Sequence, residues 1–113
     1  MALSGLTPVD SARVRAPRVG EAAIAFECKL RAVHDVEDSS GKPSGAIVIG
    51  EVLLIHVAEA VTGRSPTGKL VVDPLLLQPV SRLGGVTYGS VKELYDIPRP
   101  DKEGRYGPPA RKG

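Results

Sequence analysis

The chain has 113 residues, the size of one small domain, which can bury only a modest core. Hydrophobic residues make up 42% of it but aromatic residues only 4%, so a core must come mainly from Val, Ile, Leu and Ala, which favours sheet. The net charge is +2. The single cysteine excludes an internal disulfide and a cysteine-based metal cluster. The lack of an apolar run of about 20 residues excludes a membrane-spanning helix.

The first expected strand follows an extended arm. Residues 1–20 carry scattered glycines, prolines and arginines, which favour a loop over a helix. In "AAIAFECKL", residues 22–30, apolar side chains alternate with Glu27 and Lys29, the period of a half-buried strand. Cys28 falls on the apolar side and is predicted to be a buried thiol.

A second strand is predicted at residues 46–57, "AIVIGEVLLIHV", after the polar stretch 34–45, where we expect a chain reversal with local disorder. Both of its faces are apolar, so we expect a central strand covered on both sides. Gly50 indicates a bulge or a close backbone approach. Glu51 and His56 interrupt the apolar pattern and each needs a partner or a strand end.

The stretch "GRSPTGKL", residues 63–70, fits most of a P-loop, but Leu70 replaces the hydroxyl residue that would hold Mg²⁺. We therefore expect a turn between strands, followed by a short strand at 69–72. Asp73 can cap and Pro74 can open a single helical turn that Pro79 ends. Residues 86–97 are expected to add a short helix. The glycines of this region do not have the dinucleotide-binding spacing.

The stretch "PVSRLGGVTYGS", residues 79–90, gathers residue types suited to a flat anionic ligand. Arg82 offers a planar fork of donors, Gly84 and Gly85 allow close approach or positive φ, and Tyr88 offers a stacking face. A plain turn beside an exposed arginine explains the same residues. His56 likewise is either a proton donor or ligand contact, or a structural strand histidine.

The last residues form a basic end. From position 96 onward, five Lys or Arg face three Asp or Glu, and the stretch holds four prolines and no apolar run. Phosphate contact through this tail is the third functional hypothesis, but the acids dilute the basic charge, so we predict a solvated tail and no nucleic-acid partner. The start of the chain lacks the layout of a signal peptide, and we expect a soluble cytoplasmic protein with no membrane contact.

Several segments together carry a resemblance to a known family. "SGLTPVDSARVRAPRVGEAAIAFECKL", "AIVIGEVLLIHVAEAV", "VDPLLLQPVSRLGGVTY" and "DIPRP" occur in this order between residues 4 and 100. Together they resemble the C-terminal half of the flavin reductase-like, FMN-binding split-barrel family. The resemblance implies a mainly β fold, a partial Greek-key split barrel with short helices, in residues 1–100. Residues 101–113 have no counterpart in the family, and their composition predicts a flexible basic tail.

The family's function is implied in the same way. Its members usually form dimers, hold FMN near the subunit interface and transfer hydride from NADH or NADPH to flavin, in some cases for a monooxygenase partner. By resemblance, Arg82, Gly84, Gly85 and Tyr88 lie near the flavin or nicotinamide. His56 matches the family's "HV" position and is the acid–base candidate, while Glu51 matches its "GEV" position. No metal site is expected.

One departure opens an alternative. The strands and loops that cradle the FMN phosphate in the family come before the segment matched by Ser4–Pro8, and this sequence lacks them. The chain therefore looks like half a barrel, from a truncated or diverged protein. The alternative to a flavin reductase is a non-catalytic β-sheet dimerisation module, or a relic that no longer binds flavin.

Overall fold

A computed structural model describes residues 3–112 and divides the chain into two compact units. Residues up to Glu59 form the first unit, and residues from Ala60 onward form the second. Antiparallel strand pairs dominate both units, so the expected mainly β class with little helix is confirmed. Among the described residues each sheet has two strands, and none closes into a barrel.

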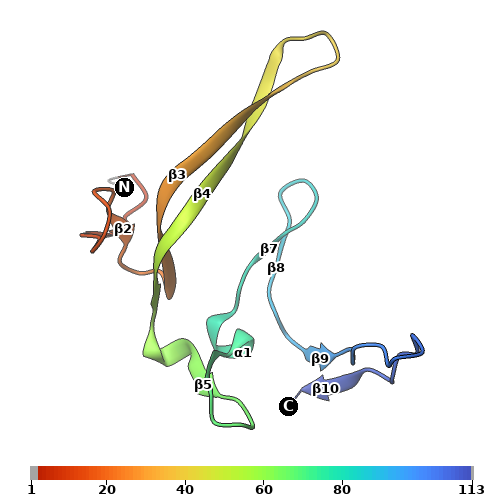
Figure 1. Ribbon diagram of the computed structural model, residues 1–113. Helices are drawn as coiled ribbons and strands as arrows, with labels where there is room; N and C mark the ends of the chain where they lie inside the picture. The colour runs from red at the N-terminus through yellow and green to blue at the C-terminus, as the bar shows by residue number, and fades with distance from the viewer. Residues whose placement is uncertain (1–2, 113) are drawn as a thin grey trace. The chain divides into compact units, whose positions relative to one another are not determined.

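The first unit contains a short hairpin and a long ribbon (Figure 1). Strand β1 (Pro8–Val9) pairs with β2 (Arg18–Val19) within the expected N-terminal arm. Strand β3 (Ile24–Glu37) pairs with β4 (Pro43–Val57), which confirms the predicted hairpin. Both strands extend well into the stretch that we expected to be the chain reversal.

The reversal itself is a closed turn rather than the disordered loop that we expected. The Asp38 carboxylate accepts hydrogen bonds from the Ser40 and Lys42 N–H groups at 2.8 and 3.0 Å and from the Ser40 hydroxyl. Gly41 supplies a φ of 83°, which a side chain would strain. These local bonds let both strands continue to the tip of the ribbon.

Three register shifts shape the ribbon. They lie between Glu27 and Cys28, between Leu30 and Ala32, and near the tip between Val36 and Glu37. Between the first two shifts, a Cβ on Gly50 would lie 3.3 Å from the Cβ of Cys28. The bulge or close approach predicted at Gly50 is therefore confirmed.

One face of the ribbon is apolar over most of its length. Residues directly opposite each other in an antiparallel pair point to the same face, and the first two bulges, one on each strand, offset each other. The exposed large apolar side chains on this face, here called the apolar ribbon face, are Phe26, Leu30, Val33, Val48, Val52, Ile55 and Val57.

Two expectations about burial are wrong. Strand 46–57 is not central, because β4 pairs with β3 alone among the described strands, and most of its side chains are exposed. Cys28 is exposed rather than buried. Both follow from the same cause: no described layer of the first unit covers either face of this part of the ribbon.

The second unit follows more of the local expectations. A 3-10 turn (Glu59–Val61) leads into β5 (Thr62–Arg64), which pairs with β6 (Leu70–Val72) across the predicted turn. Helix α1 (Pro74–Leu77) has Asp73 as its N-cap and Pro74 in its first turn, as predicted. Gln78, with a φ of 52°, ends it one residue before Pro79.

The expected helix at 86–97 is wrong. Strand β8 (Tyr88–Gly89) pairs with β7 (Ser81–Arg82), and β9 (Leu94–Asp96) pairs with β10 (Ala110–Lys112). Glycine and β-branched residues in this stretch disfavour a helix, and pairing with a neighbouring strand stabilises the extended backbone. Strand β10 brings residues 110–112 back to β9, and Arg111 forms an ion pair with Glu93 at 2.7 Å. The flexibility of residues 101–113 stays a prediction.

Replacing Asp73 by Ala tests the helix cap. The Asp73 carboxylate accepts the Leu75 N–H at 2.9 Å, so its removal is expected to reduce stability by about 1 kcal/mol. Urea unfolding followed by circular dichroism measures the loss. Asp73→Asn keeps a side-chain acceptor and is expected to retain most of the stability, and an equal loss in both variants would contradict the capping role.

Candidate functional site

The residues singled out from the sequence fall into two groups. Arg82, Gly84, Gly85 and Tyr88 lie in the second unit, and His56 lies in the first. Each group is built by local strand pairing within its own unit.

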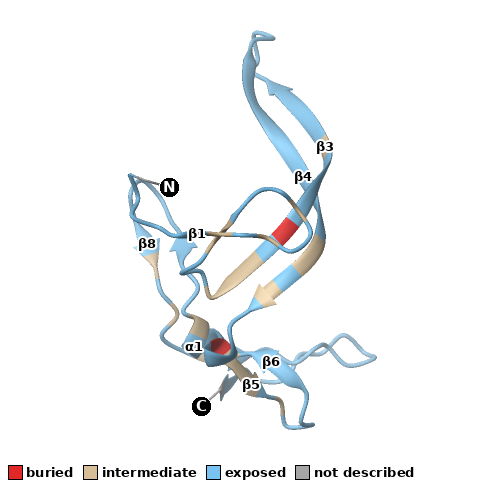
Figure 2. Cartoon of the chain, turned by 90° about the vertical axis from the view of Figure 1, so that its left-hand side faces the viewer, coloured by how far each residue is buried: buried red, intermediate tan, exposed pale blue. Residues whose placement is uncertain are grey.

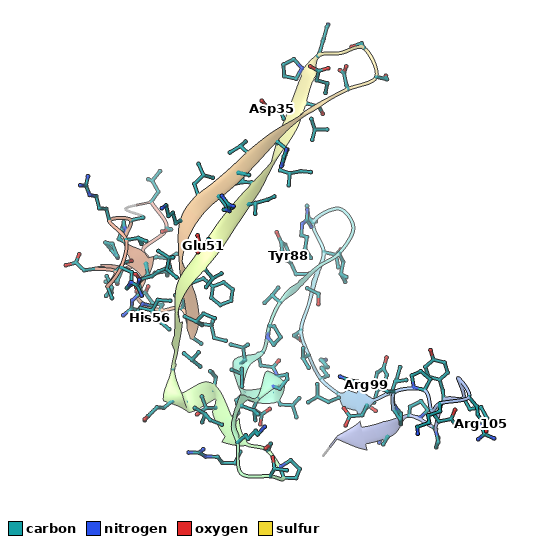
Figure 3. All side chains as sticks on the ribbon, viewed as in Figure 1. Asp35, Glu51, His56, Tyr88, Arg99 and Arg105 are labelled. Carbon is teal, nitrogen blue, oxygen red and sulfur yellow. The ribbon has the colours of Figure 1, made fainter. Side chains whose placement is uncertain are left out.

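The β7–β8 hairpin places Arg82 directly opposite Tyr88. The Arg82 Cζ atom lies 4.9 Å from the centroid of the Tyr88 ring, within the range of a cation–π contact. Its Nη1 also donates to the Leu83 and Thr87 carbonyls at 3.3 and 3.4 Å. The guanidinium therefore lies across the turn beside the ring, and Figure 3 labels Tyr88 on this hairpin.

The turn between the strands depends on its glycines. The Leu83 N–H donates to the Thr87 carbonyl at 2.9 Å, and the Thr87 N–H donates to the Gly84 carbonyl at 3.1 Å. Gly85 has a φ of 61°, a conformation that favours glycine. No atom lies within 4 Å of a Cβ built on either glycine, so the space above the turn is open.

The hairpin thus brings the four sequence-predicted residues together and leaves them accessible. Arg82, both glycines and Tyr88 are exposed, with 62% of the tyrosine accessible. Their role in ligand binding stays a prediction.

His56 has a partner that the sequence analysis missed. Its Nε2 lies 2.5 Å from Oε2 of Glu27, which is on the adjacent strand and the same ribbon face. Glu27 is 1% exposed, whereas 29% of the His56 side chain is accessible. Figure 2 colours β3 and β4 by burial, and most of the ribbon is exposed. Glu27 is the buried residue of β3.

The N-terminal loop between β1 and β2 completes this site. The Ala12 N–H donates to Oε2 of Glu27 at 2.9 Å, and the Arg13 N–H donates to Oε1 at 2.6 Å. The Ser11 hydroxyl donates to the Ala16 carbonyl at 2.6 Å and closes the loop on itself. Ala12, Arg13, Glu27 and His56 are here called the Glu27 cluster.

The charge state of Glu27 follows from these donors. Burial raises the pKa of this carboxyl, but hydrogen bonds from the Ala12 N–H, His56 and the Arg13 N–H outweigh burial and lower it to about 2. Glu27 is therefore ionised at neutral pH. Alternation in the sequence predicted an outward-facing polar residue here, and the strand register that places Glu27 and His56 on one face was not predicted.

No helix formed by the described residues has the length and apolar character to cross a membrane.

Comparison with known proteins was made in sequence and in structure. No family model matches the chain. The uncharacterized protein BH2278 of Halalkalibacterium halodurans is 34% identical over 97 residues, which are 86% of this chain and 44% of that protein. The uncharacterized protein YwrF of Bacillus subtilis is 33% identical over 97 residues, 86% of this chain and 46% of that protein.

A solved structure agrees with these relatives. Nitrilotriacetate monooxygenase component B from Bacillus cereus matches with a TM-score of 0.71 and 32% identity, over 84% of this chain and 46% of that chain. The chain therefore has the fold of one part of that protein, and it spans less than half the length of each of these three proteins.

Acid is expected to destabilise the first unit through Glu27. Its folded pKa of about 2 lies below the ordinary value of 4.5, so the ionised carboxylate stabilises the fold above about pH 4.5, and this contribution is lost as the pH falls toward 2. Glu27→Gln is expected to lower the thermal midpoint at pH 7 by several degrees and to flatten its acid dependence.

Thermal unfolding between pH 7 and pH 2 measures both effects. Hydrogen bonds from neighbouring residues also lower the pKa of Glu21, Asp38 and Asp101. The pH dependence of the thermal midpoint of the variant must therefore be compared with that of the unaltered chain. Glu37→Gln, an exposed position on β3, is the matched control. Parallel acid slopes in all three proteins would contradict the role of Glu27.

Proposed function

We propose that the chain is part of a flavin reductase-like oxidoreductase domain and that the β7–β8 hairpin binds FMN. The observation that carries the proposal is the combined likeness in fold and sequence to nitrilotriacetate monooxygenase component B, with a TM-score of 0.71 and 32% identity. Likeness in sequence at this level, over 84% of the chain, makes a related function reasonable where fold alone would not.

The hairpin residues fit one end of a flavin. Tyr88 offers an exposed ring face for stacking, and Arg82 holds a planar cation beside it at 4.9 Å. The open space above Gly84 and Gly85 allows a flat ligand to approach the backbone. Arg82 can donate to a carbonyl edge of the isoalloxazine or to a phosphate.

The phosphate cradle is not assigned to this chain. We propose that the chain corresponds to the C-terminal half of the fold, residues 1–100, and that the cradle belongs to the part of the longer relatives that it does not match. The support is the coverage: 86% of this chain matches 44% of BH2278.

FMN, when bound, would accept a hydride from NADH or NADPH and carry electrons to a monooxygenase partner. We place this activity in the cytoplasm. The chain's own residues bind and orient. Arg82 and Tyr88 fix the ring, and His56 holds a proton at an accessible imidazole.

Flavin titration tests the proposal directly. Arg82→Ala is expected to weaken FMN affinity about tenfold or more, because a charge-assisted hydrogen bond and a stacked cation are lost together. Arg82→Lys keeps the charge but not the planar fork and is expected to recover only part of the affinity. Quenching of flavin fluorescence measures the dissociation constants.

Arg64→Ala is the control, because Arg64 is also exposed in the second unit and donates to the Gly68 carbonyl at 3.3 Å. Equal affinity in the Arg82 and Arg64 variants would remove Arg82 from the site. No flavin uptake by the folded chain, even with a longer relative present, would overturn the proposed function.

The apolar ribbon face favours a second candidate, a β-sheet dimerisation module. Seven exposed apolar side chains on one face exceed what isolated surface residues explain. Both strands also have an outer edge that pairs with no described strand of the first unit. We propose that a second copy of the chain covers this surface, with or without bound flavin.

A charge on this face is expected to break the association. Val48 is 67% exposed on the apolar ribbon face, and neighbouring Ile47, 56% exposed, points to the opposite face. Val48→Lys is expected to raise the dimer dissociation constant at least tenfold, because burying an unpaired ammonium is costly, while Ile47→Lys changes it little.

Sedimentation velocity over a range of concentrations measures the dissociation constants. Equal effects of the two lysines, or a monomer at every concentration, would contradict this interface. Association without flavin uptake or NAD(P)H consumption would favour the module over the reductase.

A further inference from the structure

The pairing of His56 with Glu27 bears on the chemistry of the histidine itself. We propose that Glu27 is a positioning residue, which holds the proton of neutral His56 on Nε2 and leaves Nδ1 as the nitrogen that faces substrate. The inference deepens the proposed function and rests on it, because it takes His56 as the acid–base group of the proposed reaction.

The donor and acceptor count assigns the proton. Oε2 of Glu27 accepts from the Ala12 N–H at 2.9 Å and faces Nε2 of His56 at 2.5 Å, while Oε1 accepts from the Arg13 N–H at 2.6 Å. An ionised carboxylate has no proton to donate. The hydrogen between Oε2 and Nε2 must therefore belong to the histidine, and Nδ1 is the acceptor of the neutral ring.

The carboxylate that faces the imidazole is itself held from two directions. Ala25 lies directly opposite His56, and Glu27 is two residues further along the same strand as Ala25. The side chains of Glu27 and His56 therefore lie on one face of the ribbon. The backbone donors come from a loop whose ends are joined by β1–β2 pairing and by the Gly20 N–H on the Thr7 carbonyl at 2.8 Å. The carboxylate is therefore fixed before any ligand arrives, as a proton-transfer group requires.

Exposure separates the roles of the two side chains. Only 1% of Glu27 is accessible, so it cannot touch a substrate, whereas 29% of His56 is accessible. Glu27 thus acts through His56. The competing explanation is that Glu27 only connects the N-terminal loop to the ribbon through hydrogen bonds. That structural role requires no particular tautomer of His56.

Nitrogen-15 NMR of the imidazole side chains separates these explanations without flavin. At a pH where both histidines are neutral, we expect His56 to show a protonated Nε2 and an unprotonated Nδ1. His34 is exposed on the same ribbon and is the internal reference, with shifts averaged over both tautomers. Glu27→Gln is expected to move His56 toward this averaged pattern, and Glu37→Gln is expected to leave it unchanged.

Steady-state kinetics with NAD(P)H and added FMN provide the second readout. Glu27→Gln is expected to lower kcat about tenfold or more, with KM and the FMN dissociation constant within about twofold of the unaltered values. His56→Gln retains an N–H donor for Glu27, so it is expected to keep the thermal midpoint while losing kcat to at least the same extent.

The proposal is overturned if His56 of the unaltered chain carries its proton on Nδ1 or averages its tautomers as His34 does. It is also overturned if folded Glu27→Gln leaves the His56 shifts and kcat unchanged. If that variant does not fold, the spectrum of the unaltered chain decides. A fixed Nε2 proton without any FMN uptake supports the assignment of the tautomer and overturns the proposed function alone.

Discussion

The first unit depends on one buried negative charge. A carboxylate removed from water needs donors in fixed positions, and Glu27 takes two from the N-terminal loop and one from β4. These donors are 14, 15 and 29 positions away in sequence. A single side chain therefore joins a loop with little apolar content to a ribbon, and the same contact orients the histidine that we propose for proton transfer.

Whereas the charged side chain of Glu27 is buried, most large apolar side chains are exposed. Val61 is the only buried hydrophobic residue among those the structure describes, while the apolar ribbon face is exposed along both strands. Burying apolar surface contributes about 25 cal/mol per Å², so a face of this kind favours any layer that covers it. The relatives and the solved neighbour are more than twice as long as the part matched here, and additional length of that kind is one source of such a layer.

The sequence predicted what short-range chemistry determines. Asp73 and Pro74 define a helix start through groups two residues apart, and Gly50 marks a close approach that only an absent side chain permits. A turn at the glycines after Arg82 was one of the two interpretations of the sequence, but the pairing that brings Tyr88 opposite Arg82 was not predicted, because Tyr88 was assigned to a helix. The burial of Glu27 was missed because its two backbone donors come from another hairpin, and alternation gives the face of a residue but not what covers that face. Cys28 was assigned to the interior for the same reason.

The two candidate groups make different demands on a ligand site. Glu27 makes three contacts, two with the N-terminal loop and one with His56 of β4, so the carboxylate beside the histidine is held whatever binds. The β7–β8 hairpin has strands of two residues each and a turn that relies on Gly85 at positive φ, so little beyond its own hydrogen bonds fixes Arg82 and Tyr88. A ligand must then order Arg82 and Tyr88 as it binds, and the conformational entropy lost in this ordering reduces its affinity. If the hairpin binds FMN as proposed, further protein surface that holds the other end of the cofactor is expected to raise the affinity, because it limits the order that the hairpin must gain on binding.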